Sequence, residues 1–182
     1  MRYFAALLTF VAISLTSYGP ASADVVDDCY RTTIEVPPSN DRIISVCSEA
    51  VRVTTGQRRA ASLVSRGVGY MQKGYLDAAM ADFDESIRLH PHDSWAYSNR
   101  ANVWGLKRQY DRALSELNEL IRRDPSFIGA YVDRGVVHRE RGDLRSARAD
   151  FEAVLGMRSN RRDIEDWAKR EARRNLDELS GR

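Results

Sequence analysis

A 34-residue period constrains the fold of this 182-residue chain more than any other feature. Residue classes recur at that spacing through three copies: an arginine, a small residue beside it, a bulky ring position, a second small residue and a large apolar residue. In that order the positions are Arg66, Arg100 and Arg134; Gly67, Ala101 and Gly135; Tyr70, Trp104 and His138; Ala79, Ala113 and Ala147; and Phe83, Leu117 and Phe151. Such a period predicts stacked, similar structural units.

Each unit is predicted to be a helical hairpin. Polar and glycine-containing turns at 73–75, 107–110 and 141–143 separate two apolar-periodic segments, and Pro91 and Pro125 stop the second helix of the first two copies. The small residues let the two helices of a hairpin approach closely, the first at Gly67 and the second at Ala79 in the first copy. A hairpin cannot bury its apolar face alone, so neighbouring hairpins must stack.

The repeated blocks at 95–101 and 130–135 resemble the tetratricopeptide repeat family, and the resemblance covers residues 60–157. The third copy departs from it by lacking the closing proline and by carrying His138 in place of an aromatic ring. The resemblance implies an all-α fold, a right-handed superhelical stack of helix-turn-helix hairpins of the α-solenoid type with terminal capping helices. The expected repeats are residues 60–93, 94–127 and 128–159.

The amino terminus has the layout of a secretory signal peptide. Arg2 precedes an apolar run from Tyr3 to Leu15, the small residues of 21–23 follow, and no acidic residue comes before Asp24. A spanning helix needs about 20 apolar residues, more than this run contains. We therefore expect residues 1–23 to be removed, and the remaining chain to be secreted or periplasmic without stable membrane insertion.

The only two cysteines, Cys29 and Cys47, fall early in the expected mature chain. Export would place them where disulfides persist, and they lack both the partners of a zinc site and the spacing of a redox-active pair. We predict a bond between them. Residues 41–53 resemble the second helix of a repeat, so residues 24–59 are expected to form a degenerate hairpin, with the Pro37–Pro38 pair in its turn, stapled by this bond.

Residues 160–182 are predicted to form a capping helix that starts after Asn160. Its apolar stripe would cover the last repeat while the opposite, charged face meets water. The stripe consists of Ile164, Trp167, Ala168, Ala172, Leu176 and Leu179.

The family resemblance implies a partner-binding groove lined by the first helices of the repeats. The residues that we expect there are Val68, Met71, Trp95, Asn99, Asn102, Leu106, Val132, Asp133 and Val136. Some relatives clamp a terminal carboxylate in this groove; here Asn99 matches that pattern, but Val64 and Val68 stand where the clamp needs a lysine and an asparagine. An apolar or neutral peptide is the expected ligand. The alternative is a groove filled by the carboxy-terminal helix or by a second copy of the chain.

Other function classes have little support in the sequence. No phosphate-binding loop, nucleophile elbow or metalloprotease helix is present, and no cofactor or metal is expected. The formal net charge of +2 does not indicate a nucleic-acid partner. The repeated arginines are expected to pair with an acid of a neighbouring hairpin, such as Asp82, Glu116 or Asp150, rather than to bind an anion. The predicted function is a non-enzymatic protein-binding scaffold; the alternatives are a self-associating structural protein, such as a homodimer, and an enzyme framed by repeats.

Overall fold

The computed structural model describes residues 20–34 and 39–181 and is all-helical over these ranges. It divides into two compact units, Met1–Arg100 and Ala101–Arg182, and the boundary falls inside helix α5 (Ser94–Leu106). Of the predicted signal segment, residues 1–19 lie outside the described residues, and residues 20–23 begin helix α1. The Pro37–Pro38 pair also lies outside them.

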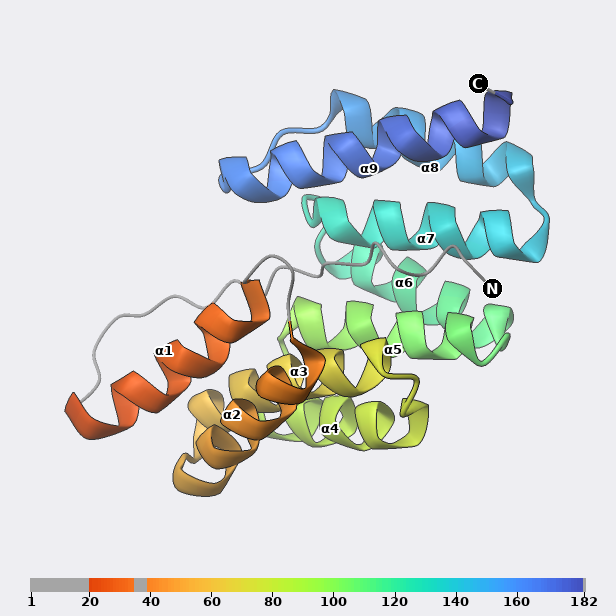
Figure 1. Ribbon diagram of the computed structural model, residues 1–182. Coiled ribbons are helices and arrows are strands. Elements are labelled where there is room, and N and C mark those ends of the chain that lie inside the picture. The colour runs from red at the N-terminus through yellow and green to blue at the C-terminus, as the bar shows by residue number, and fades with distance from the viewer. Residues whose placement is uncertain (1–19, 35–38, 182) are drawn as a thin grey trace. The chain divides into compact units, whose positions relative to one another are not determined.

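The first unit contains α1 (Pro20–Ile34), α2 (Asn40–Val53), α3 (Gly56–Gln72), α4 (Leu76–Leu89) and the first half of α5. Helix α2 packs against both α1 and α3, and α3 packs against α4, as Figure 1 shows. The predicted degenerate hairpin corresponds to α1 and α2. Its Cys29 and Cys47 form a disulfide, with the Cα atoms 4.8 Å apart, inside a small buried cluster that includes Ile43 and Ala50.

The second unit contains the rest of α5, α6 (Tyr110–Arg123), α7 (Ile128–Arg141), α8 (Leu144–Gly156) and α9 (Arg162–Ser180). Helix α7 packs against α6 and α8, and α9 lies against α7 and α8. The predicted inter-helix turns are found where the sequence places them: α3 ends at Gln72, α5 at Leu106 and α7 at Arg141. Helix α7 ends on Gly142, whose positive φ of 92° is a common way to terminate a helix.

Helix α9 differs from its prediction at both ends. It begins at Arg162 after an Arg161 cap, so the predicted cap at Asn160 is wrong; instead Glu165 reaches back to accept a hydrogen bond from the Ser159 backbone N–H at 2.9 Å. Ile164, Trp167, Ala168 and Ala172 are buried, while Leu176 and Leu179 are only partly buried.

The close contact between the two helices of a hairpin also differs from its prediction, because the glycine of the first helix faces a different residue of the second helix. A Cβ on Gly67 would lie 2.6 Å from Cε1 of Phe83, and a Cβ on Gly135 would lie 2.6 Å from Cε1 of Phe151. The small residue of the first helix therefore faces the large ring of the second helix, not its small residue Ala79. The middle repeat carries Ala101, and its large position is the smaller Leu117.

Replacing Gly67 with alanine tests this packing. In an open helix the change would stabilise by up to about 1 kcal/mol. Here the fully buried Phe83 ring must move, so we expect a net loss of about 1–2 kcal/mol in the free energy of unfolding. The double variant G67A/F83L reproduces the pair found in the middle repeat. The free energy of unfolding that the double variant loses, measured with urea, should be smaller by about 1 kcal/mol than the sum of the losses in the two single variants. Strictly additive losses would contradict a contact between Gly67 and Phe83.

Candidate partner-binding site

Four of the predicted groove residues belong to the first unit: Val68 and Met71 on α3, and Trp95 and Asn99 on α5. All four are buried, with exposed fractions between 0% for Asn99 and 9% for Trp95. The sequence places them on first helices, as the structure does. Their burial could not be inferred from the sequence, because it depends on what packs against those helices.

The other five groove residues belong to the second unit: Asn102 and Leu106 on α5, and Val132, Asp133 and Val136 on α7. Asn102, Val132 and Asp133 are buried, whereas Leu106 and Val136 are partly exposed. These two apolar side chains are the members of the predicted set that solvent or a ligand reaches most readily.

Helix α9 covers part of the same face of the second unit. Arg139, one turn beyond Val136 on α7, donates hydrogen bonds to Asn175 and, at 2.8 Å, to Glu178 of α9. Sequence periodicity assigned Asn175 no role, although it is 2% exposed. The carboxy-terminal helix therefore occupies the end of the α7 face, where it leaves Val136 partly exposed.

Two asparagines on one face of α5 keep polar atoms without hydrogen-bond partners among the described residues. Asn99 donates from Nδ2 to the Trp95 carbonyl at 2.9 Å, but its buried Oδ1 accepts nothing, and the buried Nδ2 of Asn102 donates to nothing. Buried polar atoms are usually paired, with protein, water or ligand. An amide acceptor and an amide donor three residues apart match the hydrogen-bonding groups of an extended peptide backbone.

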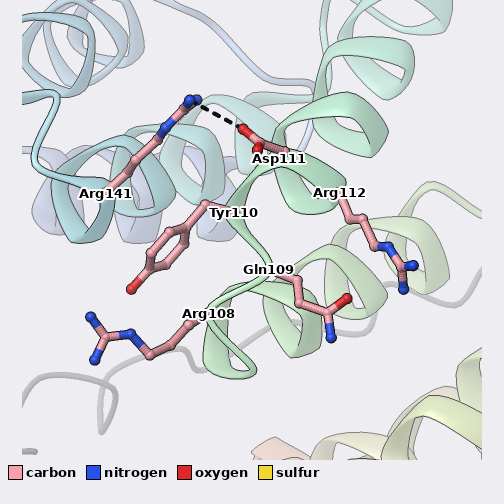
Figure 2. Close-up of a pocket in the computed structure, with 6 residues that line it drawn as sticks. All are labelled: Arg108, Gln109, Tyr110, Asp111, Arg112 and Arg141. Atoms are coloured by element: carbon pink, nitrogen blue, oxygen red, sulfur yellow. Dashed lines mark ion pairs between the residues drawn. The ribbon is translucent and has the colours of Figure 1, made fainter.

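A pocket of about 310 Å³ opens elsewhere in the second unit, at the turn between α5 and α6. It is lined by Arg108, Gln109, Tyr110, Asp111, Arg112 and Arg141, which Figure 2 shows. Arg141 pairs with Asp111 at 3.1 Å, and the Arg112 guanidinium lies 4.9 Å from the centre of the Trp104 ring. None of the predicted groove residues lines this pocket.

The repeated arginines form ion pairs, but two of them do so within a hairpin. Arg66 on α3 donates to both carboxylate oxygens of Asp82 on α4, and Arg134 makes the same pair with Asp150. The predicted acids Asp82 and Asp150 are confirmed as partners, but the prediction that they come from a neighbouring hairpin is wrong for these two arginines. It holds for Arg100, which donates to Asp84 of α4 at 2.7 Å.

The arginines also join successive hairpins. Arg66 donates a second bond to Ser48 on α2, and Arg134 donates one to Asn118 on α6 at 2.8 Å. Burial raises the pKa of the Asp82 carboxyl, although the Arg66 guanidinium works in the opposite direction. The pKa of Arg66 is raised by its hydrogen bonds to Asp82. These contacts show that Arg66 and Arg134 each link neighbouring hairpins within their own unit.

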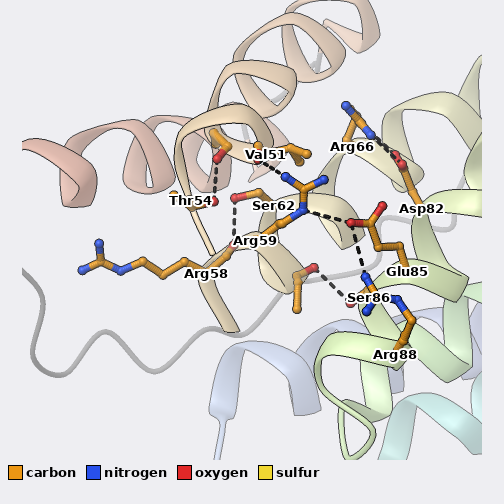
Figure 3. A network of polar contacts seen from close by, with 12 residues as sticks. Val51, Thr54, Arg58, Arg59, Ser62, Arg66, Asp82, Glu85, Ser86 and Arg88 are labelled. Atoms are coloured by element: carbon orange, nitrogen blue, oxygen red, sulfur yellow. Dashed lines mark hydrogen bonds and ion pairs between the residues drawn. The ribbon is translucent and has the colours of Figure 1, made fainter. Parts of the chain in front are cut away.

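Arg59 extends this network towards the start of the chain, as Figure 3 shows. Its guanidinium donates to the Val51 carbonyl at the end of α2 at 2.7 Å and to Glu85 on α4 at 2.9 Å. Ser86 adds a buried hydrogen bond to the Ala60 carbonyl at 3.0 Å. One side chain thus satisfies a helix-terminal carbonyl and links α2, α3 and α4.

The described residues contain no group of three or more His, Cys, Asp or Glu side chains placed to hold a metal ion. A ring nitrogen of His90 lies 3.0 Å from the Gln57 amide nitrogen, in an exposed contact. Across residues 20–34 and 39–181, no helix has the length and apolar character needed to cross a bilayer.

Comparison with known families decides the class of the protein. Residues 60–93, which span α4 and most of α3, match the model of the tetratricopeptide repeat. The chain contains a tetratricopeptide repeat at these residues. Its fold is all-α and of the tetratricopeptide type, as the 34-residue period predicts.

Three similar proteins illustrate the range of the match. RNA polymerase II-associated protein 3 of Xenopus tropicalis is 27% identical over 116 residues, which are 64% of this chain and 18% of that protein. The second repeat domain of Spaghetti (RPAP3), solved with the HSP90 peptide SRMEEVD, is 26% identical with a TM-score of 0.50, covering 60% of this chain and 99% of that one. A tetratricopeptide repeat protein of Thermus thermophilus reaches a TM-score of 0.73 at 17% identity, covering 87% and 81%.

The matched region is therefore less than a fifth of the length of the first of these relatives. The similarity extends to the repeat domain and not to the rest of that protein.

Proposed function

We propose that this tetratricopeptide repeat protein is a non-enzymatic adaptor that binds a segment of another protein along the first helices of its repeats. The observation that carries the proposal is the pair Asn99 and Asn102, whose unpartnered amide atoms lie on one face of the first helix α5. A similar repeat domain binds a peptide, the HSP90 segment SRMEEVD. Because both asparagines are buried, the ligand reaches them only if the side chains around α5 rearrange.

The proposed ligand is apolar or neutral. SRMEEVD is an acidic peptide, whereas the nine predicted groove residues named above include no lysine or arginine, and Arg139 of α7 is already paired with Glu178 of α9. Val64 and Val68 stand where the carboxylate clamp of the family needs a lysine and an asparagine, and Asp133 adds a negative charge. An acidic tail would find no counter-charge on these residues, while apolar anchors would find Leu106 and Val136.

The proposed compartment is extracytoplasmic. Two features support it: the signal-peptide layout of residues 1–23 and the Cys29–Cys47 disulfide, since such bonds persist in oxidising compartments. Fractionation of the source cells, with amino-terminal sequencing of the mature protein, tests this part. A mature chain that begins near Asp24 in the extracytoplasmic fraction supports it, and a full-length chain in the cytoplasm contradicts it.

A peptide screen tests the adaptor proposal. We expect purified protein to select neutral peptides with apolar anchors from a synthetic library, and to bind SRMEEVD at least about tenfold more weakly than the selected peptide. Val136→Glu should weaken binding of the selected peptide at least about tenfold, because it places a charge at the partly exposed apolar position of α7. Fluorescence anisotropy measures all three affinities.

Leu144→Glu is the matched control, because Leu144 is an apolar residue of the same unit, is 52% exposed and lies outside the predicted groove. It should change the affinity less than about twofold. Equal losses in both variants, or tight binding of SRMEEVD, would contradict the proposal. Sedimentation over a wide concentration range tests the self-associating alternative, which requires a mass that rises with concentration.

A further inference from the structure

The three hairpin turns provide an internal comparison. Each contains one residue in the left-handed region at the same repeat position: Gly74 with φ 79°, Arg108 with φ 61° and Gly142 with φ 92°. Glycine adopts this conformation without a steric penalty, whereas a residue with a Cβ is strained there. The middle repeat therefore holds an arginine at a position where both other repeats have glycine.

Neither packing nor pairing explains this arginine. A Cβ added at Gly74 or at Gly142 would meet no atom within 4 Å, so the position needs no side chain for packing. The Arg108 side chain is exposed, and among the described residues its guanidinium makes no hydrogen bond or ion pair. Strain that the folded structure does not use locally is a recognised mark of a functional position.

Arg108 lines the 310 Å³ pocket together with two further arginines, Arg112 and Arg141, and Figure 2 shows the Arg112 side chain on the opposite side of the turn from Arg108. Asp111 contributes the single carboxylate, so the pocket has an excess of two positive charges. Figure 2 shows the Tyr110 ring between the side chains of Arg108 and Arg141, with its hydroxyl directed towards the Arg108 side. Arg141 pairs with Asp111, and the Arg112 guanidinium lies over the Trp104 ring. Arg108 is therefore the arginine of this pocket whose guanidinium is available to donate hydrogen bonds to a ligand.

We propose that this pocket binds a phosphate group, with Arg108 as its main donor. A phosphate group carries nearly two negative charges at neutral pH and matches the charge excess of the lining. The planar guanidinium fork of Arg108 can donate two hydrogen bonds to adjacent phosphate oxygens, and the Tyr110 hydroxyl, which Figure 2 shows on the same side of the turn, adds a neutral donor. The site is separate from the proposed peptide-binding residues and does not depend on that function.

Calorimetric titration of the full chain tests the proposal, with inorganic phosphate in one arm and glycerol phosphate in the other. Saturable binding is expected, and the tighter arm identifies a free anion or a phosphate ester as the source. Arg108→Gly restores the glycine of the other repeats. It should weaken binding at least about tenfold while raising the Tm by about 2–4 °C, because it removes the strain together with the donor.

Arg158→Ala is the matched control, since it removes the same charge from an 88% exposed side chain of the same unit. It should change the affinity less than about twofold, and Arg108→Lys, which keeps the charge but loses the fork, should lie between. Binding that survives Arg108→Gly, or that is absent in the unmodified chain, overturns the proposal. A Tm lowered by Arg108→Gly also overturns it, because the arginine would then act in the fold.

Discussion

Replacing Arg66 with alanine is expected to lower the free energy of unfolding by about 3 kcal/mol. The Arg66 guanidinium donates to the two oxygens of Asp82 at 2.8 and 2.7 Å, and the Asp82 side chain is only 7% exposed. Without the arginine, α4 keeps a buried carboxylate that has lost its counter-charge. The second bond, to Ser48 of the preceding hairpin, is lost as well. Urea unfolding of the variant measures the effect.

Arg122 provides a control with the same geometry at the surface. It donates from two nitrogens to the two oxygens of Glu119, each at 2.7 Å, but its side chain is 72% exposed. Arg122→Ala should therefore cost less than about 0.5 kcal/mol. If both variants lose the same stability, burial of Asp82 is not the reason for the effect.

The pH dependence of the Arg66→Ala deficit follows from the raised pKa of Asp82. Burial raises the pKa of this carboxyl in the folded state above its ordinary value of 3.8. At pH values between the unfolded-state pKa and the folded-state pKa, the folded state therefore binds more protons than the unfolded state. The contribution of Asp82 to stability therefore falls as pH rises through that window. Removing Arg66 raises the folded pKa further. The difference in unfolding free energy between the variant and the unmodified protein should consequently narrow as the pH is lowered towards about 4, because the Asp82 carboxyl becomes neutral in both proteins.

The repeat period predicts most of the architecture, because a 34-residue spacing reports local chemistry. Turn segments, stopping prolines and buried large residues such as Phe83 are set by short stretches of chain, and each was found where the sequence places it. The sequence predicts Asp82 as an ion-pair partner of the arginines, but it does not predict that Asp82 pairs within the hairpin of Arg66 or that Gly67 faces Phe83, because both depend on the helix-to-helix register within a hairpin. Periodicity contains no information on that register.

The candidate sites were predictable to a smaller extent. The first-helix positions of residues such as Asn99 and Val136 follow from the repeat, but their burial depends on tertiary packing that a single period does not describe. The pocket at Arg108 did leave a signal in the sequence. Aligned at the 34-residue spacing, Gly74, Arg108 and Gly142 show one arginine in a glycine position. The strain itself becomes visible only when the positive φ values are known.

Removing the Cys29–Cys47 bond is the other change with a large expected effect. The double variant C29A/C47A should lose about 3 kcal/mol of unfolding free energy, because the bond restricts the unfolded chain across a separation of 18 residues. Alanine keeps the buried positions apolar, so that most of the loss reports the covalent link. The effect should concentrate in α1, whose contacts with α2 and α3 anchor it in the first unit. Relative to the unmodified protein, the C29A/C47A variant should show a larger increase in amide hydrogen-exchange rate in α1 than in α3 and α4.

Treatment with a reductant distinguishes the contribution of the covalent bond from that of the packing of the two cysteine side chains. Dithiothreitol should destabilise the unmodified protein by about the same 3 kcal/mol and leave C29A/C47A unchanged, whereas an equal response of both proteins would mean that the cysteines contribute by packing alone. Total stabilities of domains are about 5–15 kcal/mol, so this loss would remove a large share of the stability. A chain that loses this much stability without the bond is most stable where disulfides persist. The same measurement therefore bears on the compartment: insensitivity to reductant would remove one of the two arguments for an extracytoplasmic adaptor.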